Sequence, residues 1–398
     1  MEKMPYYAIT VRRYNVLFRY TEWFHQTQDL YNEILLFYYQ LYLETFPDKQ
    51  PGTQEALRIL EKLTIVGRDK QPVSNPLPWK KVPLYFRRAA INTATAAAKS
   101  YLSREQQEQP TETFTESVTF YKGMYRDFQE NTISLKLWDG EAWQWSRLRL
   151  RGNTVPEAGQ MMSPALVLKP DHAELHIPWK IPVADGRGAR ERLTAENKIC
   201  STVFTGQDAC AVCCILDPSG KRESSFYIKG GREYANASRQ IYDRIKRSED
   251  VQGGGGNVKA NYRYWKKLKN LHEHYAHQIS RQIIDYCKIQ NASILVLPEY
   301  NKDYGNIILA SVGKNSSLRL VPSIREKLKY KAWQEGIVVL EVQQHNTGSV
   351  CSRCGAKIHR KGADFQCENG HRGSRYLNMA QNIGQKCLDS FRENKTDQ

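Results

Sequence analysis

Residues 345–384 read HNTGSVCSRCGAKIHRKGADFQCENGHRGSRYLNMAQNIG, a stretch with two metal-binding knuckles followed by a helical pattern. Cys351 and Cys354 form a Cys-x-x-Cys knuckle, and Cys367 and His371 follow on a second one. Three thiolates and one imidazole at this spacing form a tetrahedral ligand set for zinc. The sequence therefore predicts a zinc ribbon with a structural role, because four protein ligands leave no open position at the metal.

The composition indicates a folded protein with a polyanionic partner. The chain has 398 residues, enough for two or three domains, and a formal net charge of +16. A basic balance of this size favours nucleic acid, although a solvated basic surface would give the same count. The sequence has no long apolar run and no apolar signal-peptide core, so we expect no membrane partner. We expect a cytoplasmic protein.

The chain has nine cysteines, an odd number, and we expect no disulfide framework. Cys210, Cys213 and Cys214 lie in the apolar run ACAVCCIL. Adjacent residues of a strand point to opposite faces, so Cys213 and Cys214 are poor candidates for one metal site. We interpret these cysteines as core thiols.

The first two hundred residues divide into a helical and a β-rich part. Residues 5–13 alternate as a short strand, and helical patterns cover 15–46, 54–66 and 84–103. From about residue 112, short alternating runs broken by glycine and proline predict an antiparallel, barrel-like sheet. Arg147, Arg149 and Arg151 alternate near tryptophans, which suits contact with a nucleic-acid backbone. The alternative is a packed tryptophan core with solvated arginines.

The pattern changes to α/β from about residue 198. We expect strands in KICSTVF and CAVCCILD, a helix over 235–248, and a glycine-rich linker over 251–258. A long basic helix follows over 258–288, then a buried strand over 292–298. A helix over 323–335 and a strand over 337–343 precede the ribbon.

Two helices carry concentrated positive charge. The start of the helix over 258–288 interleaves Tyr262, Tyr264 and Trp265 with basic residues, which suits backbone contact and base stacking. A solvated helix end is the alternative. The second run lies on the helix over 323–335. The candidate nucleic-acid contacts on these helices are Arg263, Lys266, Lys267, Lys269, Lys327, Lys329 and Lys331.

The order of these segments resembles the split RuvC nuclease domain of TnpB, the transposon-encoded RNA-guided nuclease family, and of the related type V CRISPR effectors. The resemblance covers roughly residues 198–390. It implies an RNase H-like fold in which three carboxylates hold the catalytic metal ions. Aligned on Gly206, on the strand over 292–298 and on the segment after the ribbon, those three positions are Phe204, Pro298 and Tyr376.

Phe, Pro and Tyr cannot replace the hard oxygen ligands of a two-metal site. Glu299 is one residue from its expected position, and a one-residue slip on a strand turns a side chain to the opposite face. Asp208 would need a register shift. No Asp or Glu occurs between Glu368 and Asp389. We therefore expect structural zinc, no catalytic magnesium and no nuclease activity.

The resemblance implies a multidomain protein of α+β and α/β regions: a helical recognition lobe and a β-rich wedge domain, then a RuvC-like domain with an inserted zinc ribbon. We expect the first wedge strand over 1–13, the recognition domain over 14–110, the wedge over 111–197, the RuvC-like domain over 198–345, the ribbon over 346–373, the last helix over 374–390 and a polar tail over 391–398.

This organisation implies a prokaryotic, nucleoid-associated protein with a guide RNA and a double-stranded DNA target as partners, and with the nuclease lost. The expected function is RNA-guided DNA binding that represses transcription by target occlusion. Three alternatives stay open: an inactivated type V effector that recruits transposition proteins, an active RNA-guided nuclease with displaced acids, and a DNA-binding protein without a guide.

Overall fold

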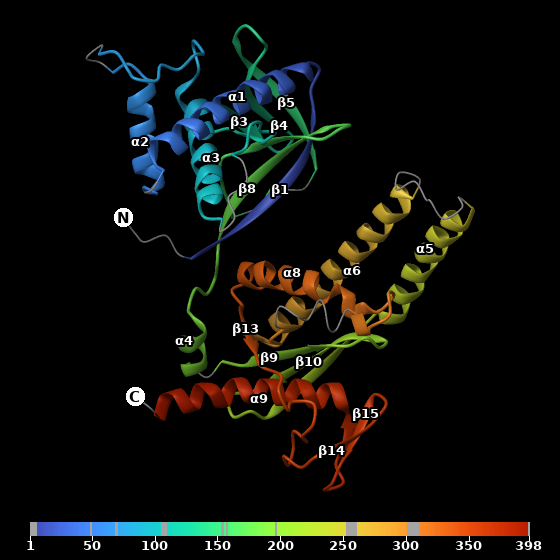
Figure 1. Cartoon of the computed structure of the whole chain (residues 1–398). Coiled ribbons are helices and arrows are strands. Elements are labelled where there is room, and N and C mark those ends of the chain that lie inside the picture. The colour runs from blue at the N-terminus through green and yellow to red at the C-terminus, as the bar shows by residue number, and fades with distance from the viewer. Residues whose placement is uncertain are drawn as a thin grey trace. The chain divides into compact units, whose positions relative to one another are not determined.

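The computed structural model describes residues 6–47, 50–67, 71–104, 110–152, 155–156, 158–195, 197–251, 261–300 and 310–396. The chain divides into two compact units. One comprises Ile9–Ile181, and the other comprises Met1–Ala8 with Pro182–Gln398. Figure 1 shows helices and sheets in both, which agrees with the mixed fold class that the sequence predicts. None of the helices in the described parts combines the length and apolar character that crossing a bilayer requires.

The unit of residues 9–181 packs three helices against an antiparallel sheet. The strand order is β2-β7-β8-β1-β5-β4-β3, with β6 paired to β8, and one apolar core joins helices and sheet. Among the described residues no pairing joins β2 to β3, so the sheet is open and not the expected barrel. The elements are β1 Tyr7–Leu17, α1 Glu22–Thr45, α2 Thr53–Thr64, α3 Leu84–Leu102, β2 Val118–Thr119, β3 Tyr125–Gln129, β4 Thr132–Trp138, β5 Trp143–Gly152, β6 Gln160–Met161, β7 Ala165–Leu168 and β8 Ala173–Pro182.

The first helix begins later than its apolar pattern indicates. The sequence predicts a helix from about residue 15, but β1 continues to Leu17 and α1 begins at Glu22. Residues Tyr14 to Leu17 pair with β5, where Leu17 lies opposite Arg149. Tertiary strand pairing therefore overrides the local helical period at this boundary.

The second unit is built on a five-stranded mixed sheet of order β11-β10-β9-β12-β13. Strand β10 is antiparallel to both β9 and β11, whereas β12 is parallel to both β9 and β13. The elements are α4 Ala189–Thr194, β9 Ile199–Phe204, β10 Ala209–Leu216, β11 Arg222–Lys229, α5 Gly231–Val251, α6 Tyr262–Ile289, β12 Ile294–Pro298, the 3₁₀ helix η1 Ser317–Leu320, α8 Val321–Gln334, β13 Val338–Val342, β14 Ile358–Lys361, β15 Asp364–Cys367, β16 Arg372–Ser374 and α9 Arg375–Thr396.

Helices cover both faces of this sheet, as Figure 1 shows for α6 and α8 on one side and α9 on the other. Successive residues of β9 alternate between the two cores: Cys200 packs toward α6 and α8, whereas Ile199 packs toward α9. Cys213 and Cys214 follow the same rule on β10. Both are free and buried, so they are core thiols as the sequence predicts.

The helix α9 is longer than its sequence pattern indicates. It extends to Thr396 and includes most of the expected polar tail over 391–398. Strand β11 is not among the predicted elements, because seven of its eight side chains are exposed or half-buried. The expected glycine-rich linker over 251–258 and the first residues of the basic helix lie outside the described residues, apart from Val251, which ends α5.

Candidate metal centre and the edge of the mixed sheet

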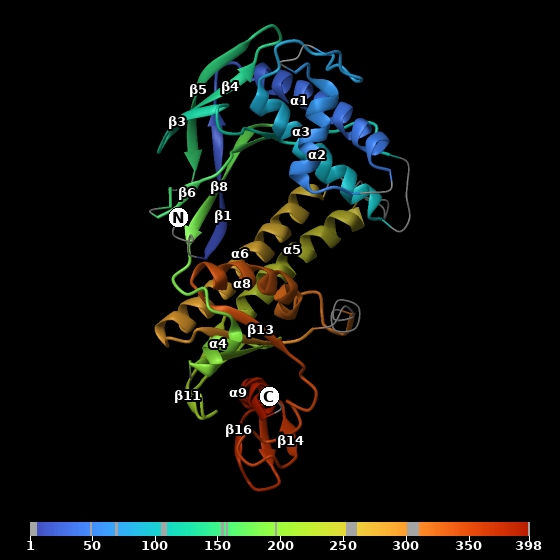
Figure 2. The same cartoon turned by 90° about the vertical axis from the view of Figure 1, so that its left-hand side faces the viewer.

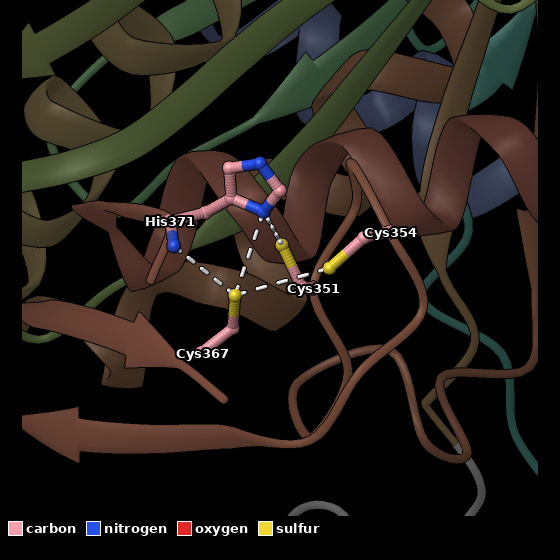
Figure 3. Close-up of side chains that lie close together, drawn as sticks. All are labelled: Cys351, Cys354, Cys367 and His371. Atoms are coloured by element: carbon pink, nitrogen blue, oxygen red, sulfur yellow. Dashed lines mark hydrogen bonds between the residues drawn. The ribbon is translucent and has the colours of Figure 1, made fainter. Parts of the chain in front are cut away.

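The four predicted zinc ligands meet in space. The ligand atoms of Cys351, Cys354, Cys367 and His371 all lie within 4.8 Å of one another, and Figure 3 shows the three sulfur atoms and the imidazole converging. The Sγ atoms of Cys354 and Cys367 are 3.8 Å apart, and His371 Nδ1 is 3.5 Å from Cys367 Sγ. A tetrahedral zinc ion with Zn–S bonds of about 2.3 Å separates two sulfur ligands by about 3.8 Å, so the cluster fits a metal ion.

Two glycines shape the knuckles. Gly355 follows Cys354 with a φ of 73°, and Gly370 precedes His371 with a φ of 82°. Glycine adopts this left-handed region without steric cost. The turn at Gly370 places the next residue, His371, beside the three cysteine sulfur atoms.

The electrostatics of the cluster favour one thiolate at neutral pH. The backbone N–H of Ala356, with help from His371, lowers the pKa of Cys354 to about 6. Burial raises the pKa of Cys351 above its usual value. Metal ligation needs deprotonated sulfur. Of these two thiols, the exposed Cys354 is the one whose thiolate form is favoured.

Two asparagines of α9 fasten the ribbon to the helix. Asn378 Nδ2 donates to the Val350 carbonyl at 2.7 Å, and its Oδ1 accepts from the Ser352 N–H at 2.8 Å. Asn382 Nδ2 donates to the carbonyls of Thr347 and Val350. Figure 2 views α9 along its axis, with the ribbon strands beside it. Both asparagines lie in the stretch quoted at the start of the sequence analysis, four residues apart. Their spacing alone does not reveal that they bind the loop of the ribbon.

We expect the variant Asn378→Ala to lower the free energy of unfolding by about 1–3 kcal/mol, because it leaves the Ser352 N–H without its acceptor in a buried place. Asn378 is 2% exposed. Zinc content should stay unchanged, since no ligand is touched. Urea denaturation combined with metal analysis measures both. Asn270→Ala, at an exposed position of α6, is the matched control, and an equal loss of stability in both variants would contradict the fastening role.

The positions expected for catalytic acids lie at the ends of neighbouring strands. Phe204 is the last residue of β9, and Pro298 is the last residue of the parallel neighbour β12. Phe204 is 7% exposed and packs in the core under α6 and α8. Tyr376 lies in the first turn of α9 and lines a cavity of about 530 Å³ together with Thr205 and Gly206, which directly follow Phe204.

The two alternative acids, Asp208 and Glu299, have different surroundings. Asp208 lines the same cavity and is the single carboxylate among its described lining residues, with its Oδ1 atom 3.6 Å from Arg232 Nε. Glu299 follows β12 as an exposed residue. In the described part of the chain, the ribbon is the one place where three or more His, Cys, Asp or Glu ligand atoms cluster.

Comparison with known proteins finds two family models that match separate segments of the chain. The Aq_aa04 family matches residues 7–139, and the Cas12f1-like TNB domain matches residues 323–383. The TnpB-like protein aq_aa05 of Aquifex aeolicus (strain VF5) is 27% identical over 154 residues, which cover 35% of this chain and 49% of the relative. The chain is similar to TnpB-like proteins and, over residues 323–383, to the Cas12f1-like effectors.

Solved structures agree in fold. A Cas12f1–sgRNA–target DNA complex superposes with a TM-score of 0.57 at 14% identity, covering 92% of this chain and 82% of that one. The mini-RNA-guided endonuclease CRISPR-Cas_phi3 gives a TM-score of 0.56 at 10% identity, covering 98% and 93%. The TnpB-like chain therefore has the Cas12 effector fold, and its sequence match spans about half the length of the curated relative.

The basic residues of α6 are free for a partner. Arg263, Lys266, Lys267 and Lys269 are exposed on the first turns of this helix, and no ion pair within the described residues engages them. Tyr262 and Trp265 are exposed beside them, 61% and 44% respectively. This segment of the TnpB-like protein offers cations and aromatic faces together.

The arginine row of β5 has the alternation that the sequence predicts. Arg147, Arg149 and Arg151 are exposed, whereas Leu148 and Leu150 between them are buried. The neighbouring tryptophans are divided. Trp138 and Trp143 pack against each other with ring centroids 5.5 Å apart, and Trp145 carries the Arg126 guanidinium over its ring.

The three lysines of α8 do not all face solvent, although the sequence pattern suggests that they do. Lys327 is 7% exposed, with its Nζ 2.7 Å from Glu273 of α6. Lys331 donates to the His277 carbonyl and to Ser280, and burial lowers its pKa to about 8. Residues four apart share one helix face, and this face of α8 packs on α6. Lys329 points elsewhere and is 62% exposed beside Glu341.

Proposed function

We propose that this TnpB-like protein is a nuclease-inactive, RNA-guided DNA-binding protein that represses transcription by occupying its target. The observation that carries the proposal is the residue set at the three metal-binding positions, Phe204, Pro298 and Tyr376. A two-metal nuclease uses carboxylate oxygens to hold two ions about 3.5–4 Å apart. An aromatic ring, a proline and a phenol supply no such ligands at neutral pH.

The strand order supports an RNase H-like assignment of the second unit. Three antiparallel strands, β11, β10 and β9, continue into the parallel strands β12 and β13, with helices on both faces. The RuvC domain of the resembling family has this arrangement. Phe204 and Pro298 stand at neighbouring strand ends of this sheet, where such domains carry their first two acids.

Zinc is the metal we propose for the ribbon. The Cys351, Cys354, Cys367 and His371 set is closed, with three thiolates and one imidazole, which zinc prefers over the hard cations magnesium and calcium. All four ligands come from the protein, so the ion would hold the fold and leave chemistry to other groups.

Guide RNA and target DNA are the proposed partners. The solved relatives include a complex with single-guide RNA and target DNA. In such systems base pairing reads the sequence, and the protein holds the heteroduplex through its backbone. The exposed cations of α6 and the β5 arginine row suit contact with a nucleic-acid backbone. Such contact depends on positive charge and does not require recognition of the bases. Occupancy without cutting is sufficient to block transcription.

The test is guide-dependent binding. Protein expressed with its native flanking DNA should co-purify with one dominant RNA species and should prefer a duplex matched to that RNA over a scrambled one. Replacing Arg263, Lys266 and Lys267 with alanine should weaken binding. It should also reduce the slope of log K against log salt by about 0.9 for each phosphate that the variant no longer neutralises. Electrophoretic shift assays across a salt series measure both.

The control removes the same charge from dispersed exposed positions, Lys62, Lys122 and Lys221. An equal loss of affinity in both variants would show a general charge effect and move the contact surface elsewhere. Binding of matched and scrambled duplexes with equal affinity, without a co-purified RNA, would identify a DNA-binding protein that uses no guide.

A further inference from the structure

One of the nine cysteines is exposed to solvent. All nine lie in the described part of the chain, and eight of them are buried whereas Cys354 is exposed. The six cysteines outside the ribbon are between 0% and 3% exposed. Burial also raises the pKa of Cys210 to about 11 and that of Cys214 to about 12, which keeps both protonated at neutral pH. A cysteine reacts with oxidants as its thiolate, so the ribbon carries the one accessible thiol.

The turns beside the ligands are open to solvent. Gly355 follows Cys354 directly, and a Cβ atom built on this glycine would meet no atom of the described neighbouring segments within 4 Å. The same holds for Gly370, which precedes His371 on the second knuckle. Because Cys354 is exposed and its turn is uncovered, a small oxidant can reach the sulfur atom without movement of the protein.

A second thiol lies within reach of the first. Cys367 Sγ is 3.8 Å from Cys354 Sγ (Figure 3), and a disulfide bond closes such a separation to about 2.05 Å. Cys367 is 3% exposed, and its sulfur accepts a hydrogen bond from the main-chain N–H of His371 at 3.2 Å. An exposed cysteine beside a sheltered one is the arrangement in which the first is oxidised and the second then closes a disulfide bond.

We infer that Cys354 is an oxidative modification site, at which a hydroperoxide induces a disulfide bond with Cys367 and releases the metal ion of the ribbon. The inference rests on the proposed zinc site. A thiol that coordinates a metal ion is deprotonated, so zinc keeps the Cys354 sulfur in its nucleophilic form. Disulfide sulfur is no longer a thiolate, and the thiolate is the form that binds metal. The metal therefore loses two of its four ligands together.

The oxidation has two steps. The Cys354 thiolate attacks the terminal oxygen of the hydroperoxide: a sulfur–oxygen bond forms, the oxygen–oxygen bond breaks, and an alkoxide or hydroxide ion leaves. The Cys367 thiolate then attacks the sulfur of this sulfenic acid: a sulfur–sulfur bond forms, the sulfur–oxygen bond breaks, and a hydroxide ion leaves. The two sulfur atoms together lose two electrons, which the hydroperoxide gains, and both leaving anions take protons from water.

Loss of the ion should unfold the ribbon reversibly. Cys351 and His371 remain as ligands, and two ligands do not make a closed zinc site. Apart from its ligands, the buried core of the ribbon contains Ile358 and Phe365, which is too little apolar surface to keep the segment ordered. A disulfide bond is a reversible state of cysteine oxidation, so a thiol reductant and zinc together should restore the ribbon.

The test uses the full-length protein, purified under anaerobic conditions and analysed for zinc before hydrogen peroxide is added. A chromogenic chelator should report release of the zinc, and dithiothreitol with added zinc should reverse it.

Peptide mapping identifies the disulfide bond. Trypsin places Cys354 on residues 354–357 and Cys367 on residues 362–372. Cys351 falls on a different peptide, because a basic residue separates it from Cys354. Mass spectrometry of the oxidised protein without reductant should therefore find the peptides of Cys354 and Cys367 linked to each other. This measurement needs no variant.

The variant Cys354→His keeps four ligands in a Cys2His2 set and removes the exposed thiol. Peroxide should release its zinc at least about tenfold more slowly than that of the unmodified protein, because oxidation favours accessible thiolates. Cys387→Ala, which removes a buried core thiol, is the matched control and should release zinc at the unmodified rate. Where Cys354→His does not hold zinc, the peptide map of the unmodified protein decides.

Three results would overturn the inference: equal rates of zinc release from Cys354→His and the unmodified protein, a first disulfide bond that joins any other pair of cysteines, and full retention of zinc after Cys354 and Cys367 are linked. Protein that holds no zinc before oxidation refutes the proposed metal site itself. Zinc that is present and survives peroxide refutes the oxidation alone, so the two failures are distinguishable.

Discussion

Purified with its guide RNA, the protein should bind a matched DNA target and leave both strands intact in magnesium or manganese. Binding should survive because the exposed cations of α6 and β5 include none of the positions Phe204, Pro298 and Tyr376. Cleavage fails because no pair of hard oxygen ligands stands at Phe204, Pro298 and Tyr376. Denaturing gels of end-labelled target strands, run beside a binding assay on the same samples, measure both.

Restoring the carboxylates tests the geometry. Phe204→Asp, Pro298→Glu and Tyr376→Asp together should return three carboxylates to one end of the sheet, where Phe204 packs with the core of α6 and α8 and Tyr376 with the core of α9. Each single change should leave activity at zero, since one carboxylate cannot hold two ions. Phe204→Asp alone should also lower stability, because Phe204 is 7% exposed and an unpaired buried carboxylate is costly.

One result would contradict the proposed inactivity outright. If the unmodified protein cuts a matched target, and Asp208→Ala or Glu299→Ala abolishes cutting, the acids have moved and the alignment at β9 and β12 is wrong. A scrambled target is the control for contaminating nuclease, because adventitious cleavage does not depend on the guide.

The ribbon can be predicted from the spacing of its ligands along the sequence. How separate helices and strands pack against one another cannot be predicted in this way. The ligands Cys351, Cys354, Cys367 and His371 lie within one short segment, so their convergence depends on two turns and little else. The helices and the two buried strands of the mixed sheet also follow from the sequence pattern, because their apolar residues repeat at the period of a buried face or form a short apolar run.

Which face of a helix is exposed to solvent depends on the elements that pack against it. The sequence alone does not predict this for α8. The sequence predicts Lys327 and Lys331 as surface cations, yet they face α6, where Glu273 and the His277 carbonyl accept from them. Strand β11 shows the same limit, since its one fully buried residue, Ile228, gives no alternating signal.

Purified protein should carry about one zinc ion per chain, and Cys354→Ser or Cys367→Ser should lose it. The ribbon's own core consists of four buried residues, two of which are ligands: Cys351, Ile358, Phe365 and Cys367. A core this small cannot offset the entropy of ordering the segment. Zinc contributes about 10–16 kcal/mol of apparent folding free energy in comparable modules, so loss of the ion should unfold the ribbon while the mixed sheet stays folded.

The two ligand variants separate metal loss from packing loss. Cys354 is exposed and Cys367 is 3% exposed, so Cys354→Ser removes a ligand with little change in packing. Both should release zinc in a chromogenic chelator assay and make residues 345–374 sensitive to protease. Cys387→Ala, in the core under α9, is the control: it should lower the free energy of unfolding and keep the zinc. Protein that contains no zinc, or Cys354→Ser that retains it, would refute the ribbon site. Because Asn378 and Asn382 bind the loop before the knuckle, release of zinc should also free the start of α9.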